Sequence, residues 1–261
     1  MDHWITKKLL VSGCSFSAQY PKNPDGFQLL TWPYHVRDTL GSNLTNLSWV
    51  GAGNSYIADS VINHISVNDI NPFDTFVLVM WSGPARKDLT VSKDFYHNQV
   101  GGAYPFKTYI DGVYYVMGGD QLECMASNKD YKQVFKHLYQ TQDIGVIADE
   151  SLRHILRLKT FLEHRGFQYR FMSYVNYWED TPNIVGRCDI SLKYYASNSL
   201  LTQLGNNWIW ADEHQNCLYE YVKERKLISY RPMGDDFHPT VQGHKQFAID
   251  IVIPQIRKYF I

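Results

Sequence analysis

The stretch "DTFVLVMW" at residues 74–81 is a continuous apolar run, and it predicts a β-strand that is buried on both faces. A second run of this kind, "KLLVS", lies at residues 8–12. Such runs are typical of parallel strands, because helices cover both faces of a parallel sheet. The two runs therefore predict two strands of a parallel sheet.

Three segments between and after these strands have the pattern of helices. "WPYHVRDTLG" (32–41) carries a proline early and a glycine at its end, and "SYIADSVINHI" (55–65) repeats apolar residues at helical spacing. "ADESLRHILRLKTFLEHRG" (148–166) is the clearest helix, and it leads into a strand expected at 167–175. Strands that alternate with helices predict a doubly wound α/β sheet with right-handed crossovers.

A last helix is expected to begin after Pro239, where Thr240 can cap it. Its apolar positions include Phe247, which we expect to face the core. Pro254 is expected to bend or end this helix, because proline lacks the backbone N–H that a helix interior needs.

Residues 88–145 interrupt the alternation of strands and helices. They are rich in Tyr, Gly and Asp, and "KTYIDGVYYV" (107–116) predicts a hairpin that turns at Asp111 and Gly112. We expect this segment to be an insertion at the rim of the sheet. No repeat or low-complexity linker marks a second domain, so one domain over residues 1–261 is expected.

Charge, cysteine content and the N-terminal sequence exclude several classes of protein. With 25 basic and 26 acidic residues the net charge is -1, so no overall field attracts nucleic acid or an anionic membrane. No secretory signal and no membrane-spanning apolar run is present, so we expect a cytoplasmic protein, with association with a viral particle left open. Without a CxxC pair, buried free thiols are expected at Cys14, Cys124, Cys188 and Cys217.

Small and polar residues follow the expected strands, at the edge where parallel α/β sheets bind ligands. "GCSFS" (13–17) would project Ser15 from a tight turn at Gly13. "NLSWVGAGNS" (46–55) places two glycines before a helix, where backbone N–H groups can approach a ligand. "WSGPARKD" (81–88) follows the second buried strand. Taken alone, each segment fits an ordinary turn or loop equally well.

A fourth segment, "GDDFHPTVQGH" (234–244), places Asp235 three residues before His238, on a turn that enters the last helix. A carboxylate that accepts from Nδ1–H would leave Nε2 free to take a proton from a serine hydroxyl. On its own this spacing is common, and a solvated aspartate beside a capping histidine is the more frequent explanation.

In this order and spacing, the four segments resemble the conserved blocks of the SGNH, or GDSL-type, hydrolases. The resemblance runs from about residue 8 to residue 250, and it is close only in the first and last blocks. It implies a flavodoxin-like three-layer α/β/α fold and no metal or organic cofactor. It also implies a catalytic triad of Ser15, His238 and Asp235.

The resemblance implies an oxyanion hole made by the N–H groups of Ser15 and Gly53, with Gly51 as the second choice. Cys14 stands where the family has an aspartate. A thiol nucleophile there is discounted, because adjacent residues that leave a strand point in opposite directions and Cys14 would then face the core.

The third block departs from the family pattern. Where the family has a glycine followed by an asparagine that donates to the oxyanion, this chain has Gly83 followed by Pro84, which has no donor. Losing one oxyanion donor typically costs about 2.7–4 kcal/mol of transition-state stabilisation. Ser82 and Arg86 are candidates to replace it, and loop capping or a surface ion pair explains them equally well.

The resemblance implies hydrolysis of a small-molecule or glycan ester. Because related hydrolases include carbohydrate O-acetyl esterases, it also implies a carbohydrate O-acetyl ester as the expected substrate class. Aromatic residues at the expected rim suit sugar rings, although tyrosines that simply pack the insertion onto the sheet are the alternative. The candidate substrate-binding residues are Arg86, Asn54, Tyr177 and Trp178. The alternative function is a weakened module of this fold that binds a glycan or forms part of a virion, which Pro84 favours. The sequence does not indicate an oligomeric state.

Overall fold

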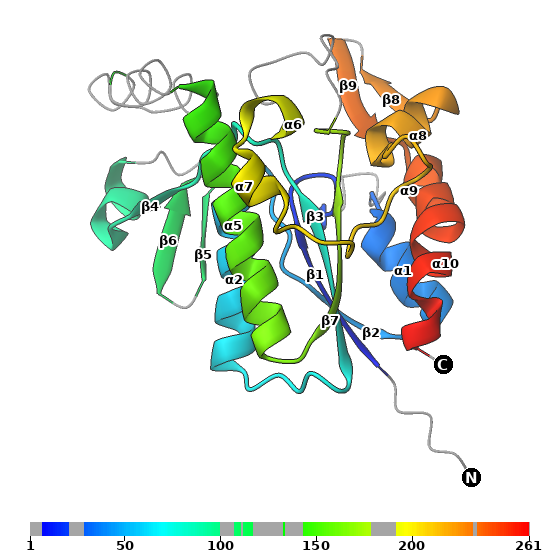
Figure 1. Cartoon of the computed structure of the whole chain (residues 1–261), viewed down its shortest axis with the longest axis horizontal. Helices are drawn as coiled ribbons and strands as arrows, with labels where there is room; N and C mark the ends of the chain where they lie inside the picture. The colour runs from blue at the N-terminus through cyan, green and yellow to red at the C-terminus, as the bar shows by residue number, and fades with distance from the viewer. Residues whose placement is uncertain are drawn as a thin grey trace.

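The computed structural model describes residues 7–20, 29–99, 107–110, 112–116, 133, 143–178, 192–231 and 234–260. Its centre is a four-stranded parallel sheet in the order β2-β1-β3-β7 (Figure 1). The strands are β1 (Lys8–Gly13), β2 (Asn43–Asn46), β3 (Thr75–Trp81) and β7 (Gln168–Ser173). The two apolar runs form the central pair, with Lys8 opposite Thr75 and Gly13 opposite Met80.

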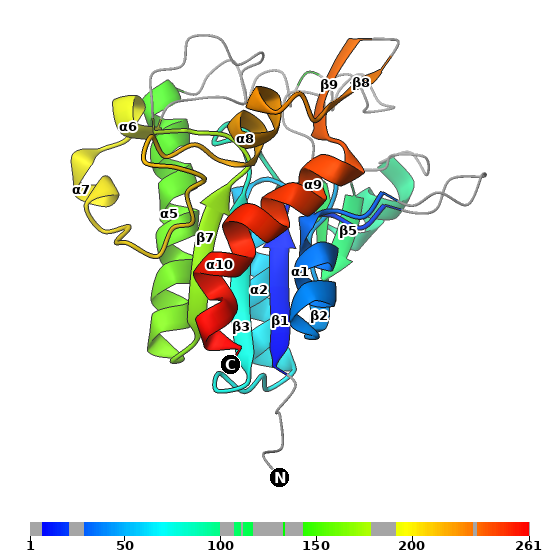
Figure 2. The ribbon, with the colours of Figure 1, turned by 90° about the vertical axis from the view of Figure 1, so that its right-hand side faces the viewer.

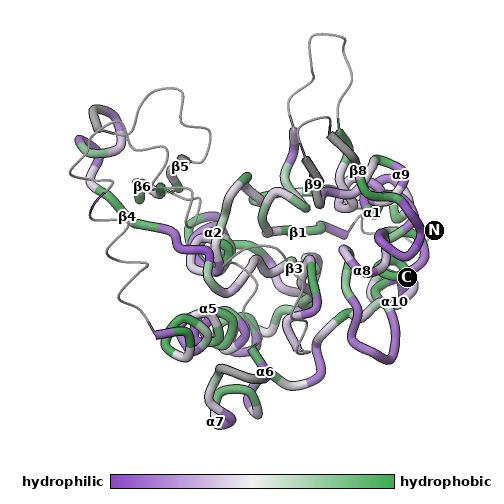
Figure 3. The backbone as a smooth tube through the Cα atoms, turned by 90° about the horizontal axis from the view of Figure 1, so that it is seen from above, coloured by the Kyte–Doolittle hydropathy of each residue, from purple (hydrophilic) through white to green (hydrophobic). Residues whose placement is uncertain are grey.

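Helices cover both faces of this sheet. Helix α1 (Trp32–Leu40) lies with the C-terminal helices on one face, and α2 (Asn54–Val67) packs against α5 (Ile144–His164) on the other (Figure 2). Viewed from above, β1 and β3 lie between these two groups of helices (Figure 3). Every residue of β3 is therefore buried. The arrangement confirms the expected three-layer α/β/α fold with a parallel sheet.

The first and longest helices begin and end for local chemical reasons. Helix α1 ends at Gly41, whose φ of 63° is a left-handed conformation that glycine adopts without strain. Helix α5 begins at Ile144, before the expected start at residue 148, because the Asp143 side chain accepts a hydrogen bond from the Gly145 N–H. The buried face of α5 includes Leu152, Ile155 and Leu162, as its apolar spacing predicts.

The C-terminal helix continues through Pro254. Helix α9 (Val241–Phe247) is capped by the Thr240 hydroxyl, which accepts from the Gly243 N–H at 3.0 Å. A π-helical turn (Ala248–Val252) then leads into α10 (Ile253–Ile256) and a short 3-10 turn (Arg257–Tyr259). A wider turn before the proline accommodates a residue that cannot donate a backbone hydrogen bond. Of the two effects expected of Pro254, an end to the helix is therefore wrong, and the irregularity lies in the π-helical turn just before it.

The insertion contains a small antiparallel sheet in the order β4-β6-β5. Its strands are β4 (Leu89–Val91), β5 (Lys107–Ile110) and β6 (Val113–Val116), and a π-helical turn (Phe95–Gln99) follows β4. The hairpin of β5 and β6 is as predicted, with Gly112 at a φ of 83°, while Asp111 lies outside the described residues. The ring of Tyr115 packs edge-on against Tyr56 of α2 at 5.3 Å, which attaches the insertion to the domain.

The remaining elements lie between β7 and the last helix. They are α6 (Leu192–Tyr195), α7 (Asn198–Leu201), α8 (Leu218–Glu224), β8 (Ile228–Arg231) and β9 (Gly234–Pro239). Strands β8 and β9 pair as an antiparallel hairpin. Cys14 and Cys217 are buried free thiols, as expected, and Cys124 and Cys188 lie outside the described residues. None of the helices in the described part of the chain has both the length and the apolar composition needed to cross a bilayer.

One polar side chain of α9 is completely buried. His244 has 0% of its surface exposed, and neither ring nitrogen has a hydrogen-bond partner among the described residues. Burial, together with the smaller effects of the His238 and His35 imidazoles, lowers its pKa to about 3. The imidazole of His244 is therefore neutral at neutral pH.

We expect His244→Phe to make the protein less sensitive to acid. The histidine pKa rises from about 3 to its ordinary 6.5 on unfolding, so the unfolded chain binds an extra proton and the free energy of unfolding falls as the pH drops through this range. Phenylalanine removes that proton and also leaves no buried polar atom unsatisfied. Urea unfolding at pH 7 and pH 5 measures both effects, with the exposed His214→Gln as control. If the free energy of unfolding fell equally between pH 7 and pH 5 in the wild type and in His244→Phe, the expectation would be contradicted.

Candidate active site

Ser15 lies in a tight turn directly after β1. The N–H groups of Ser17 and Ala18 both donate to the carbonyl of Cys14, at 2.9 and 3.0 Å. Gly13 permits this turn, because a Cβ at that position would lie 2.7 Å from the Ser17 hydroxyl. Cys14 is fully buried, as predicted, while Ser15 keeps 5% of its surface exposed. The turn therefore presents the serine at the carboxyl edge of the sheet.

The structure brings Ser15 and His238 together. The Nε2 atom of His238 lies 2.8 Å from the Ser15 Oγ, although 223 positions separate the two residues in the chain. This distance is within the range expected of a nucleophile and its general base. The predicted contact is thus confirmed.

His238 is held by the β8–β9 hairpin rather than by a loop. It is the penultimate residue of β9, and the Thr240 N–H that follows donates to the Leu227 carbonyl at 2.8 Å. The backbone of Asp235 pairs with Tyr230 in the same hairpin. The side chain of Asp235 lies outside what the structure describes, so its role in the triad stays a prediction.

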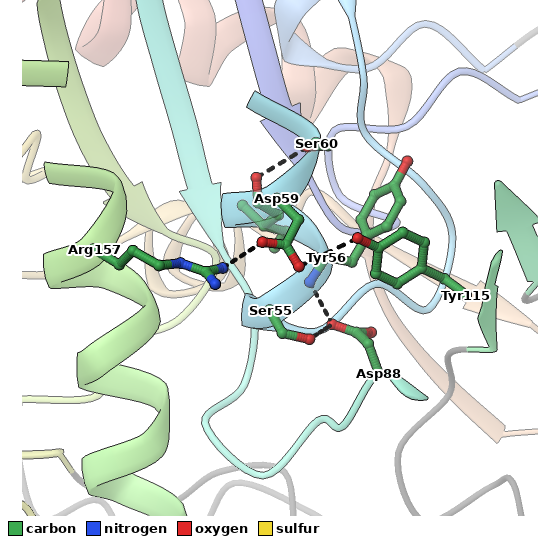
Figure 4. Close-up of polar contacts among 8 residues, drawn as sticks. Ser55, Tyr56, Asp59, Ser60, Asp88, Tyr115 and Arg157 are labelled. Carbon is green, nitrogen blue, oxygen red and sulfur yellow. Dashed lines mark hydrogen bonds and ion pairs between the residues drawn. The ribbon is translucent and has the colours of Figure 1, made fainter. Parts of the chain in front are cut away.

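A carboxylate that no sequence motif indicates caps the N-terminus of α2 (Figure 4). The Oδ1 atom of Asp88 accepts from the Gly53 N–H at 2.7 Å. Its Oδ2 accepts from the Tyr56 N–H at 2.7 Å and from the Ser55 hydroxyl at 2.8 Å. A negative charge here satisfies free N–H groups and interacts favourably with the helix dipole. Asp88 therefore fixes the start of α2 from outside the helix.

This cap corrects the expected oxyanion hole. The N–H of Gly53 is not available for a substrate oxyanion, because it donates to Asp88. Gly51, the second choice, has a φ of 80° and is partly exposed, and its N–H donates to no acceptor among the described residues. Gly53 has a packing role instead, since a Cβ there would lie 2.5 Å from the Arg86 carbonyl oxygen.

The Asp88 carboxyl is partly neutral near pH 6. Burial raises its pKa to about 6, while hydrogen bonds from the capped groups and the charge of Arg86 act in the opposite direction. The charge of Asp88 adds to the effect of burial in raising the pKa of the Tyr56 phenol. For Tyr115, burial and then Asp59, which accepts from its hydroxyl at 3.2 Å, raise the pKa more than Asp88 does.

Asn54 and Ser82 are structural rather than ligand-binding. The Asn54 amide accepts from the Ser82 N–H at 2.8 Å and donates to the Ser82 carbonyl at 3.1 Å and to the Ser151 hydroxyl at 2.6 Å. Asn54 therefore joins α2, the loop after β3 and α5, with only 3% of its surface exposed. The Ser82 Oγ is buried and has no partner in the described part of the chain, so a substrate cannot reach it without a local rearrangement. The substrate-binding role expected for Asn54 and the oxyanion role expected for Ser82 are both corrected.

The two aromatic residues expected to bind a sugar pack against other aromatic rings. Tyr177 is 3% exposed and packs edge-on against Tyr174 at 5.8 Å. Trp178 is partly exposed and packs edge-on against Trp208 at 5.3 Å and against Trp210 at 6.1 Å. Tyr177 is therefore too deeply buried to bind a sugar ring, and Trp178 has a packing role with two other tryptophans.

Arg86 remains at the wall of the site. It is partly exposed, and its guanidinium lies 5.7 Å from the centre of the Tyr174 ring. Tyr174 directly follows β7, so its ring lies at the same edge of the sheet as Ser15. Among the expected substrate-binding residues, Arg86 is thus the one whose position still fits the role.

Comparison of the chain with protein-family models and with curated protein sequences finds no match in either case. The assignment of chemical roles therefore depends on the geometry of Ser15, His238 and the groups around them.

We expect Asp88→Asn to weaken the dependence of stability on pH between pH 4 and pH 6. The folded protein holds this proton with a pKa of about 6 and the unfolded chain with 3.8, so the free energy of unfolding of the wild type falls as the pH rises through this interval. Asparagine has no proton to exchange there. Chemical denaturation across the interval tests this, with the exposed Asp38→Asn as control. If the free energy of unfolding changed with pH in the same way in the wild type and in Asp88→Asn, the prediction would be contradicted.

Proposed function

We propose that this protein is a serine hydrolase that cleaves ester bonds, with Ser15 as nucleophile and His238 as general base. The observation that carries the proposal is the 2.8 Å contact between the Ser15 Oγ and the His238 Nε2. It supports proton transfer from the hydroxyl to the imidazole as the oxygen attacks a carbonyl carbon.

The reaction then follows from these two groups. The Ser15 oxygen bonds to the acyl carbon, and the alcohol leaves with the proton that the imidazole returns to it. Water next attacks the acyl-serine while His238 accepts a proton from it, and the acid and the free serine are released. Asp235 would orient the imidazole in this scheme.

The N–H groups of Ser15 and Gly51 are the proposed donors to the oxyanion. Neither donates to an acceptor among the described residues, and Gly51 is partly exposed. Pro84 supplies no third donor, which predicts a slow enzyme, since one missing donor costs about 2.7–4 kcal/mol of transition-state stabilisation. The Arg86 guanidinium is the remaining cation that could approach an anionic intermediate or an acidic substrate group.

Membership of the SGNH hydrolases is part of the proposal. It is supported by the parallel sheet, by a serine in the turn after the first strand, and by a histidine just before the last helix that contacts it. Two features set the chain apart, Pro84 in the third block and the Asp88 carboxylate on the Gly53 N–H.

The substrate is proposed only as an ester. Tyr177 is buried and offers no aromatic surface to a sugar ring, and the partly exposed Trp178 packs edge-on against Trp208. An acetylated glycan therefore has no specific support from Tyr177.

We expect Ser15→Ala to abolish labelling by a fluorophosphonate probe and to lower the rate of p-nitrophenyl acetate hydrolysis at least about a thousandfold, because the nucleophile is lost. His238→Gln should slow both reactions strongly, since the hydroxyl then has no base. The exposed Ser199→Ala is the matched control and should react like the wild type. Equal hydrolysis by wild type and Ser15→Ala would reject the mechanism.

A second candidate, a module of this fold without efficient chemistry, is favoured by Pro84 and by the occupied Gly53 N–H. Folded wild-type protein that is not labelled at Ser15 but binds a glycan on an array would favour this candidate. Labelling at Ser15 would favour the enzyme.

A further inference from the structure

We propose that Phe16 is a positioning residue, and that with Tyr174 it forms an aromatic column that holds the His238 imidazole facing the Ser15 hydroxyl. The catalytic consequence of this column rests on the proposed function. The column itself is a property of the fold.

The three rings are stacked in sequence. The ring centroids of His238 and Phe16 lie 4.5 Å apart with an interplanar angle of 17°. Those of Phe16 and Tyr174 lie 4.4 Å apart with an angle of 14°. Phe16 is therefore sandwiched between the imidazole and the phenol, and the Arg86 guanidinium lies 5.7 Å from the centre of the Tyr174 ring. Near-parallel rings at these separations attract one another beyond simple area burial.

The column restricts a motion that the Ser15 contact leaves open. A hydrogen bond fixes the position of Nε2 but allows the imidazole plane to tilt about it, whereas a stacked face fixes the plane. His238 stands on the β8–β9 hairpin, outside the main sheet, while Phe16 is 2% exposed and Tyr174 is 7% exposed in the core. Phe16 thus connects the orientation of the imidazole to the core.

Ser15 and Phe16 are neighbours in the chain, so the nucleophile and the stacking ring belong to the same turn. Phe16 directly follows Ser15 in the turn closed on the Cys14 carbonyl, so one backbone turn sets the nucleophile and the surface on which its base rests. A small movement of this turn would displace the Ser15 hydroxyl and the face of Phe16 together.

The column would also stabilise the positive charge that the His238 imidazole gains during the reaction. The imidazole becomes a cation when it takes the serine proton, and a cation over the face of an aromatic ring is attracted by its quadrupole. An aliphatic side chain of similar size gives the packing without this attraction. The stabilisation grows as the proton is transferred, so its loss should lower kcat and leave KM unchanged.

The kinetic test compares Phe16→Leu with Phe16→Tyr. We expect Phe16→Leu to lower kcat for p-nitrophenyl acetate about 3- to 30-fold at unchanged KM. Phe16→Tyr should keep a kcat close to that of the wild type, because tyrosine still presents an aromatic face to the imidazole. Phe171→Leu is the matched control, because this fully buried ring of β7 packs against Trp81 and Trp208 and not against His238. A general loss of stability would affect Phe171→Leu as much as Phe16→Leu.

A spectroscopic test does not require activity. Stacking on Phe16 shifts the ring-proton resonances of His238 upfield, and they can be assigned from their absence in His238→Gln. We expect these resonances to move downfield in Phe16→Leu and to stay in place in Phe16→Tyr and Phe171→Leu. If Phe16→Leu does not fold, Tyr174→Leu removes the other half of the column and should lower kcat in the same direction.

The outcomes separate this proposal from the proposed function. His238 resonances that do not move in Phe16→Leu, or an active Phe16→Leu with unchanged kcat, overturn the positioning role. A wild type that is not labelled at Ser15, but whose His238 resonances move in Phe16→Leu, overturns the hydrolase and supports the column.

Discussion

The parallel pairing of β1 and β3 is the constraint on which the site depends. Since the two strands run in the same direction and are buried on both faces, their carboxyl ends must emerge at the same edge of the sheet. The end of β1 supplies Ser15, the loop after β3 supplies Arg86, and the end of β7 supplies Tyr174. Each of these residues is local to a strand end, and only His238 comes from elsewhere.

Much of the fold and the central contact were predictable, because each has a local pattern. Continuous apolar runs identify buried strands, and the spacing of glycine, serine and histidine matches a known arrangement. The Asp88 cap was not predictable, since a single aspartate 35 positions from the Gly53 N–H it accepts from has no sequence signature. The burial of Tyr177 was also missed, because hydropathy does not say which way a chain turns after a strand.

Asp88 and Pro84 together change what the site can do. The free N–H groups at the N-terminus of α2, which carry a partial positive charge, donate to the Asp88 carboxylate. The loop after β3 has Pro84 at the position where a hydrogen-bond donor is expected. In the proposed hydrolase, the stabilisation of an anionic intermediate would then depend on the N–H groups of Ser15 and Gly51. The fold thus keeps Ser15 and His238 in contact, while the Gly53 N–H is occupied and Pro84 offers no donor.

The contact across 223 positions has a consequence for biosynthesis. The ribosome releases the segment with the hydroxyl and its partners in the sheet first, and the histidine follows 223 positions after the serine. A nascent chain can therefore pair β1, β2, β3 and β7 before His238 is present. In the proposed hydrolase, Ser15 would gain its base only when the β8–β9 hairpin docks, so its reactivity would wait for the completed fold.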